Sequence, residues 1–200
     1  MKTVLIASNN AHKAVEIAEA LDFLGWEFKT LKQAGVQSDP EENGETFLDN
    51  ARIKAYAAQQ ASGGMAVLAD DSGLEVDALG GAPGVHSARY AGEPCDDAAN
   101  NAKLLDALAN VPDKRRTGRF VCHLVYLDEQ GRETDARGTV EGRIAHEAHG
   151  QHGFGYDPLF LPEVFGFERS LGQALPEEKN AVSHRGNALR ELRKKLSENA

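Results

Sequence analysis

The sequence predicts an α/β protein whose mixed β-sheet is flanked by helices. Short, almost continuously apolar segments, typical of buried strands, alternate with longer segments that carry apolar residues at helical spacing. Two consecutive extended segments around a polar turn near residue 130 add antiparallel strands, so the sheet is expected to be mixed. The length of 200 residues suits one domain, and we expect residues 1–200 to form it.

The chain begins with an expected strand, a helix and a second strand. Thr3–Ala7 is short and almost continuously apolar, as a strand buried on both faces would be. From His12 onward, apolar residues recur at helical spacing until Gly25, which indicates a helix, and a second strand is expected over Glu27–Leu31. This strand–helix–strand order is typical of α/β proteins.

The later elements follow from the same two kinds of pattern. Helices are expected over Thr46–Ala61, Asp96–Ala109 and Pro176–Leu196. Strands are expected over Met65–Ala69, Arg119–Leu127, Glu133–Ile144 and Pro158–Leu161. The last strand follows a glycine-rich loop, Gly150–Asp157, and Ser183 is a candidate cap for the second half of the last helix.

Composition and charge restrict the classes of partner. The formal net charge of −9 disfavours binding to nucleic acid, because affinity for its backbone comes largely from Lys and Arg. No apolar span reaches membrane-crossing length, and the first apolar run is too short for a signal peptide, so we expect no membrane partner and a cytoplasmic location. Cys95 and Cys122 lack metal-ligand spacing and are expected to be free thiols.

The loop after the first strand is a candidate phosphate site. It consists of Ser8, Asn9, Asn10, Ala11, His12 and Lys13. Free backbone N–H groups at the start of a helix bind anions, and a lysine in the first turn opposes the helix dipole unless an anion lies beside it. The alternative is an ordinary strand-to-helix turn with a solvated lysine.

A lysine on the apolar face of an expected helix is a second candidate. On a helical wheel Lys54 falls between Ala51 and Ala58, so its ammonium needs a partner, or its side chain must extend past the small alanines to water. Just before this helix, Glu41 and Glu42 are either a capping device or oxygen ligands for Mg²⁺.

Two adjacent carboxylates, Asp70 and Asp71, follow the apolar run Met65–Ala69. Ligands of open α/β sheets bind outside the carboxyl ends of strands, where we expect this pair to lie. Adjacent side chains of an extended chain point in different directions, so one carboxylate could bind a metal and orient water while the other holds a lysine or backbone groups. Ser72 adds donors. A turn or a helix cap is the alternative.

Phe154 lies between two glycines in the glycine-rich loop, where its ring could stack on a nucleobase or simply belong to the core. Lys179, His184 and Arg185 come near a helix junction, and an arginine can fork onto phosphate or a keto oxygen. For these cations a solvated helix face is the alternative. Together the acidic pair, the scattered cations and the aromatic favour a nucleoside triphosphate site.

Five segments carry a resemblance to a known family. They are SNNAHK (8–13), EENGETFLDNARIKA (41–55), ADDSGLEVDALGGAPGVHSARYAG (69–92), GFGYDPLF (153–160) and EEKNAVSHRGNAL (177–189). In this order, over nearly the full length, the chain resembles the inosine/xanthosine triphosphate pyrophosphatases. The first loop departs slightly, since the family often has Thr-Gly-Asn where this chain has Ser8-Asn9-Asn10; the hydroxyl and the final amide are retained.

The resemblance implies an elongated mixed α/β fold with two lobes and a central substrate cleft, and a homodimer. It also implies Mg²⁺-dependent hydrolysis of ITP, dITP and XTP to the monophosphate and pyrophosphate, which keeps deaminated purines out of nucleic acids. Two alternatives remain open: a related nucleotide pyrophosphatase that acts on other modified or standard nucleotides, and a nucleotide-binding regulator without catalysis.

The resemblance also implies roles for individual residues. Asp71 matches the catalytic acid/base, and Asp71 with Glu42, or by register Glu41, matches the metal ligands. Ser8, Asn10 and Lys13 match phosphate-binding positions, Lys54 is expected to stabilise the leaving pyrophosphate, and the rest of the first loop, Asn9, Ala11 and His12, is expected to contact substrate. The other matching substrate contacts are Ser72, Phe154, Gly155, Tyr156, Asp157, Lys179, His184 and Arg185.

Overall fold

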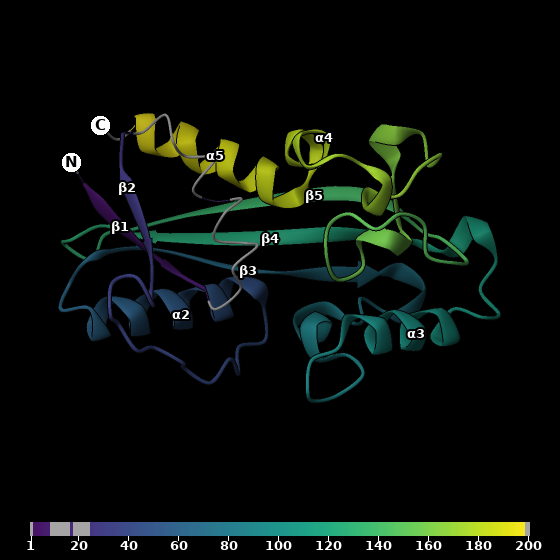
Figure 1. The fold of residues 1–200 in the computed structure, drawn as a ribbon, viewed down its shortest axis with the longest axis horizontal. Coiled ribbons are helices and arrows are strands. Elements are labelled where there is room, and N and C mark those ends of the chain that lie inside the picture. The colour runs from purple at the N-terminus through teal and green to yellow at the C-terminus, as the bar shows by residue number, and fades with distance from the viewer. Residues whose placement is uncertain (1, 9–16, 18–24, 199–200) are drawn as a thin grey trace. The chain divides into compact units, whose positions relative to one another are not determined.

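The computed structural model describes residues 2–8, 17 and 25–198. Its six strands form one sheet in the order β2-β1-β3-β4-β5-β6 (Figure 1). They are β1 Thr3–Ala7, β2 Glu27–Thr30, β3 Ala66–Val76, β4 Thr117–Leu127, β5 Glu133–Ile144 and β6 Phe160–Pro162. Strand β1 runs parallel to β2 and β3, whereas β6 is antiparallel to β5, so the predicted mixed α/β sheet is confirmed.

Four α-helices accompany the sheet in the described residues: α2 Phe47–Ala61, α3 Asp97–Ala107, α4 Pro176–Val182 and α5 His184–Glu198. The helix expected after His12 falls outside the described part of the chain, apart from the buried helical residue Ile17. Within the described residues, no helix combines the length and apolarity needed to cross a bilayer.

The chain divides into two compact units. The first comprises Met1–Asp71, Cys122–Gly138 and Arg185–Ala200, and the second comprises Ser72–Val121 and Thr139–His184. Strands β3, β4 and β5 contribute residues to both units. That the two units belong to one domain stays a prediction.

The core of the first unit lies on both faces of the sheet. Along β1, Val4 and Ile6 pack in one apolar cluster with residues of α5, whereas Leu5 packs in a second cluster with α2. Figure 1 accordingly shows α2 and α5 on opposite sides of this part of the sheet. Because successive side chains of a strand point to opposite faces, the continuous apolar run of β1 serves both helices.

Helix α2 owes its start and its close packing to local sequence. Thr46 and Asp49 form a capping box in which each side chain binds the other residue's backbone N–H, at 3.1 Å in both cases. The small side chains of Ala51, Ala55 and Ala58 are fully buried against the sheet. This packing places Lys54, which lies between them on the helix, close to the sheet as well.

Strand β3 differs from its prediction. The apolar run was expected to end the strand at Ala69, but β3 continues through Asp70 and Asp71 to Val76. The parallel pairing with β1 ends at the Ala7–Ala69 pair, while β4 lies on the other side of β3. The acidic pair therefore lies inside β3, just past the point where the neighbouring strand β1 ends, and not at the carboxyl end of β3 itself.

Two smaller differences concern the C-terminal half. The strand expected over Pro158–Leu161 begins later, as β6 at Phe160, because Asp157–Leu159 forms a 3-10 turn. The helix expected over Pro176–Leu196 is broken at Ser183, whose extended backbone (ψ 157°) separates α4 from α5.

Candidate active site

Asp70 and Asp71 lie on opposite faces of the first unit. Alternation along β3 places Asp70 on the face of Ala66 and Leu68, which pack with α5, and Asp71 on the face of Val67 and Ala69, which pack with α2. Both carboxylates are buried, with 1% and 8% of the residue exposed. Since buried carboxylates need cations or donors, each face must supply its own partner.

On the α2 face, Lys54 joins two carboxylates from separate segments. Its Nζ lies 2.8 Å from Oδ1 of Asp71 and 3.0 Å from Oε2 of Glu42. Burial by itself lowers the pKa of this ammonium, but the carboxylates of Asp71, Asp70 and Glu42 outweigh burial and raise the pKa above its ordinary value of 10.5. Lys54 is therefore a charged partner that holds two acidic groups at one point.

On the α5 face, Asp70 pairs with Arg185. Its Oδ2 lies 3.2 Å from Nη2 of the guanidinium, and the side chains are 0% and 2% exposed. Arg185 was predicted to contact substrate from the helix junction. The structure places it at the start of α5, facing a carboxylate of the neighbouring strand. Asp70, predicted to hold a lysine or backbone groups if Asp71 bound the metal, holds this arginine.

The second unit brings together Phe154 and the predicted site lysine Lys179. The Nζ of Lys179 lies 2.8 Å from Oδ2 of Asp157 and 4.5 Å from the ring centroid of Phe154. The same Asp157 oxygen accepts the backbone N–H of Phe154 at 2.9 Å. Lys179 and Asp157 are buried, while Phe154 is half-buried. These three predicted site residues, 25 positions apart at most, are thus brought into contact.

Glycine at 153 is required by this turn. Gly153 has a φ of +76°, and a Cβ built there would lie 2.1 Å from Oδ2 of Asp157, the oxygen already bound by Lys179. Gly155 also has a positive φ, +61°, but its Cβ would meet open space. The first glycine therefore lets the Asp157 carboxylate approach the backbone, while the second serves the backbone conformation alone.

The remaining predicted residues are placed as follows. Ser8 is half-buried directly after β1, and Asn9, Asn10, Ala11, His12 and Lys13 lie outside the described residues. Ser72 is a half-buried residue of β3. His184 is buried and its ring stacks on Phe120, with centroids 4.8 Å apart and an interplanar angle of 14°.

Sequence reasoning missed the residues that anchor the glycine-rich loop. The N–H of Gly155 donates to Asp97 at 2.7 Å, its carbonyl accepts from Asn101 at 3.0 Å, and the Tyr156 hydroxyl donates to the Ser87 carbonyl at 2.8 Å. Asp97 and Asn101 belong to α3, 58 and 54 positions before Gly155. No local pattern marks them, because polar residues at the start of a helix are common.

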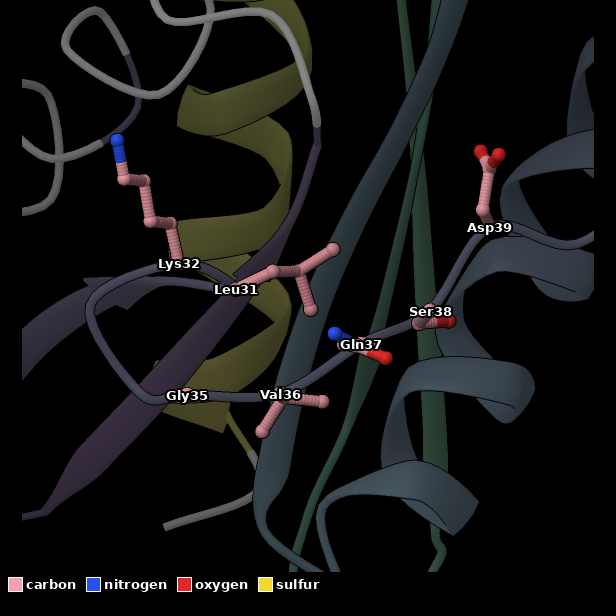
Figure 2. Close-up of a pocket in the computed structure, with 7 residues that line it drawn as sticks. All are labelled: Leu31, Lys32, Gly35, Val36, Gln37, Ser38 and Asp39. Carbon is pink, nitrogen blue, oxygen red and sulfur yellow. The ribbon is translucent and has the colours of Figure 1, made fainter.

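A cavity of about 590 Å³ lies beside the loop that follows β2. It is lined by Leu31, Lys32, Gly35, Val36, Gln37, Ser38 and Asp39, which Figure 2 shows along one stretch of chain. This stretch offers one lysine and one aspartate, and none of the predicted site residues. We assign it no part in the site.

Fold and site define a class: a mixed α/β protein with a carboxylate–lysine centre in one unit and a glycine-flanked aromatic beside a buried lysine in the other. The chain belongs to the Ham1 family, whose model matches residues 4–195. The dITP/XTP pyrophosphatases of Desulforamulus reducens and Bacillus subtilis are 50% and 45% identical to it. These alignments cover 95% and 98% of this chain, and 92% and 98% of the relatives.

Solved structures agree with this assignment. A HAM1 protein from Coxiella burnetii matches with a TM-score of 0.88 at 40% identity, over 99% of this chain and 100% of that one. The Staphylococcus aureus Ham1 protein matches with a TM-score of 0.87 at 39% identity, over the whole of both chains.

Proposed function

We propose that this protein hydrolyses deaminated and related non-standard purine nucleoside triphosphates, ITP, dITP and XTP, to the nucleoside monophosphate and pyrophosphate. The observation that carries the proposal is the convergence of Glu42, Lys54 and Asp71 at one point of the first unit. The names of the relatives support the reaction and the substrate class. Turnover of this kind keeps deaminated purines out of nucleic acids.

The chemistry of the donors fits a divalent cation of the Mg²⁺ type. Carboxylate oxygens of Asp71 and Glu42 both contact the single ammonium of Lys54, so two hard ligands from separate segments already face one cation. In the described part of the chain, no group of three or more His, Cys, Asp and Glu side chains is placed to hold a metal. Two carboxylates completed by substrate phosphates are a typical Mg²⁺ arrangement.

When bound, the metal would neutralise phosphate charge and lower the pKa of a coordinated water. Asp71 is the proposed general base, because it is buried on the face that carries Lys54 and can accept a proton from water directed at the α-phosphorus. Lys54, with Ser8, Asn10 and Lys13 of the first loop, would stabilise the negative charge that develops on the departing pyrophosphate. The buried Arg185–Asp70 pair holds β3 against α5 beneath this site.

The second unit supplies the proposed purine contacts. The Phe154 ring, half-buried and backed by Lys179, offers an aromatic face to a base. A 6-keto oxygen can accept from donors such as His184 or nearby N–H groups, and from a guanidinium N–H of Arg185, which belongs to the first unit and also pairs with Asp70. The 6-amino group of adenine would meet these donors. Such an unpaired polar group costs about 1–3 kcal/mol when buried, which favours inosine over adenosine nucleotides.

A product analysis tests the reaction. The purified chain is incubated with Mg²⁺ and ITP, dITP, XTP, GTP or dATP, and the products are separated by ion-exchange chromatography. We expect IMP and pyrophosphate from ITP, little turnover of dATP, and loss of turnover with EDTA that added Mg²⁺ restores. Release of orthophosphate with IDP would contradict the mechanism, and preference for a standard nucleotide would favour a related pyrophosphatase instead.

The homodimer and the cytoplasmic location are also proposed on the resemblance. Light scattering coupled to size-exclusion chromatography would give the mass in solution, for which we expect twice the chain mass of 21.6 kDa. A monomer at micromolar concentration would contradict the dimer.

A further inference from the structure

The loop that carries Phe154 is held from one side by helix α3. The peptide group that joins Phe154 to Gly155 donates its N–H to Oδ2 of Asp97 at 2.7 Å. The next peptide group accepts at the Gly155 carbonyl from Nδ2 of Asn101 at 3.0 Å. The two consecutive peptide groups that follow Phe154 are therefore both fixed by one turn of α3.

We propose that Asp97 and Asn101 are positioning residues that set the orientation of Phe154 for the purine base. The inference rests on the proposed function, since it assumes that Phe154 is a base contact. Neither side chain was assigned any role from the sequence. They act on the substrate only through the backbone of the loop.

Helix α3 is a suitable support because both of its ends are fixed. At its start the Asp96 side chain accepts the backbone N–H of Ala99 at 3.0 Å. At its end the buried Arg116 donates to the Leu108 carbonyl at 2.8 Å. Between them Leu104 is fully buried in the apolar core of the second unit. A side chain on the first turns of α3 is thus tied to the core.

The loop needs such support because its own sequence is permissive. Phe154 is flanked by glycines with φ of +76° and +61°, a residue type with more backbone freedom than any other. The Phe154 N–H bond to Asp157 fixes the turn from within. The Asp157 N–H also donates to the Phe154 carbonyl at 3.3 Å, whereas the N–H and the carbonyl of Gly155 bind α3. Loss of the α3 contacts would therefore add disorder that binding must remove.

The chemistry of the two contacts is directional. A carbonyl can only accept, so Asn101 must present its amide nitrogen to Gly155, and its Oδ1 is buried without a hydrogen-bond partner among the described residues. An aspartate at 101 would have no donor and would set a carboxylate against a carbonyl. At position 97, by contrast, asparagine retains an acceptor oxygen. The two sites therefore respond oppositely to an exchange of amide and carboxylate.

The test compares steady-state kinetics of ITP hydrolysis in D97A, D97N, N101A and N101D with the wild type. We expect D97A to raise KM for ITP about three- to tenfold with little change in kcat, as loss of one partly exposed charge-assisted hydrogen bond would. D97N should recover most of that loss, and N101D should be worse than N101A. D106A removes the side chain of an exposed aspartate on the same helix; it is the matched control and should behave as wild type.

Product inhibition separates positioning from general damage. IMP carries the base and pyrophosphate does not, so inhibition by IMP should weaken by the same factor as KM rises, while inhibition by pyrophosphate should stay unchanged. Equal weakening of both, or a D97A/N101A double variant with a wild-type KM, would overturn the positioning role while leaving the proposed function intact. A wild-type protein that releases no pyrophosphate from ITP would overturn the proposed function itself.

Discussion

Asp70 and Asp71 are adjacent in the sequence, yet their carboxylates form ion pairs on opposite faces of the sheet. Asp70 meets Arg185 of α5 at 3.2 Å, and Asp71 meets Lys54 of α2 at 2.8 Å. Alternation along an extended strand produces this separation without any special geometry. The two carboxylates therefore have different surroundings. Asp70 pairs with a buried guanidinium, whereas Asp71 shares the ammonium of Lys54 with Glu42.

Asp71→Asn is expected to lower kcat for ITP by about 10²–10⁴-fold, the range for loss of a general base. The amide is isosteric and can still receive the Lys54 hydrogen bond, so the midpoint of thermal unfolding should fall by no more than a few degrees. Circular dichroism checks the fold and chromatographic product analysis checks the rate. A variant with near-normal turnover would remove Asp71 from the catalytic role.

Glu42→Gln and Glu41→Gln form a matched pair that identifies the metal ligand. Only Glu42 reaches the point where Lys54 and Asp71 meet, and Glu41 is exposed. Exchange of the anionic carboxylate for a neutral amide weakens this ligand and should raise the Mg²⁺ concentration for half-maximal activity roughly tenfold or more in Glu42→Gln. Glu41→Gln should need the same Mg²⁺ concentration as wild type. A larger increase in Glu41→Gln than in Glu42→Gln would assign the ligand to Glu41.

Arg185→Met should strongly destabilise the fold. The variant leaves Asp70, fully buried, without its arginine, and breaking a buried ion pair typically costs about 3–5 kcal/mol. Arg52→Met, which removes a half-exposed pair with Glu133, should cost no more than about 1 kcal/mol. Urea unfolding followed by circular dichroism measures both, and equal losses would show that the burial of Asp70 has no energetic weight.

Gly153→Ala and Gly155→Ala test whether the loop needs glycine for the close approach of the Asp157 carboxylate or only for a positive φ. Both residues have positive φ, so each alanine carries a strain of roughly 1 kcal/mol. Only at 153 does the new Cβ collide with Asp157, whose carboxylate Lys179 holds in place. KM for ITP should therefore rise clearly more in Gly153→Ala than in Gly155→Ala, and the opposite ranking would contradict the observed turn.

Asp128 should contribute to acid stability. Burial alone raises its pKa, but hydrogen bonds from the backbone and side chain of Arg132 and from the Gln130 N–H outweigh this and hold the pKa below its ordinary value of 3.8. A carboxyl whose pKa is lower in the folded chain binds fewer protons there than when unfolded, so its contribution is present above pH 3.8 and is lost as pH falls through the lowered value.

In Asp128→Asn this part of the pH dependence should disappear. Chemical unfolding of wild type and variant between pH 7 and pH 3 tests it: the difference in unfolding free energy between the two should shrink in the most acidic samples. A difference that grows toward low pH would have the wrong sign.

Many elements follow from local pattern. The apolar run Thr3–Ala7 and the alternating segment Glu133–Ile144 form strands with the predicted bounds, and the Asp96–Ala109 helix differs only at its ends. The extension of β3 through Asp70 and Asp71 could not be predicted in this way. Two acidic residues followed by Ser-Gly favour a turn locally, and the arginine that neutralises Asp70 lies 115 positions later.

By itself, the sequence determined the fold class, most of the elements and the residue types of the candidate site, because periodicity and residue chemistry are local properties of the chain. Tertiary structure alone decided which charges meet: Lys54 with Glu42 and Asp71, Arg185 with Asp70, Lys179 with Asp157. It also decided that Asp97 and Asn101 hold the loop of Phe154. Such pairs depend on side chains that packing brings together from separate elements, from 12 positions apart for Glu42 and Lys54 to 115 for Asp70 and Arg185.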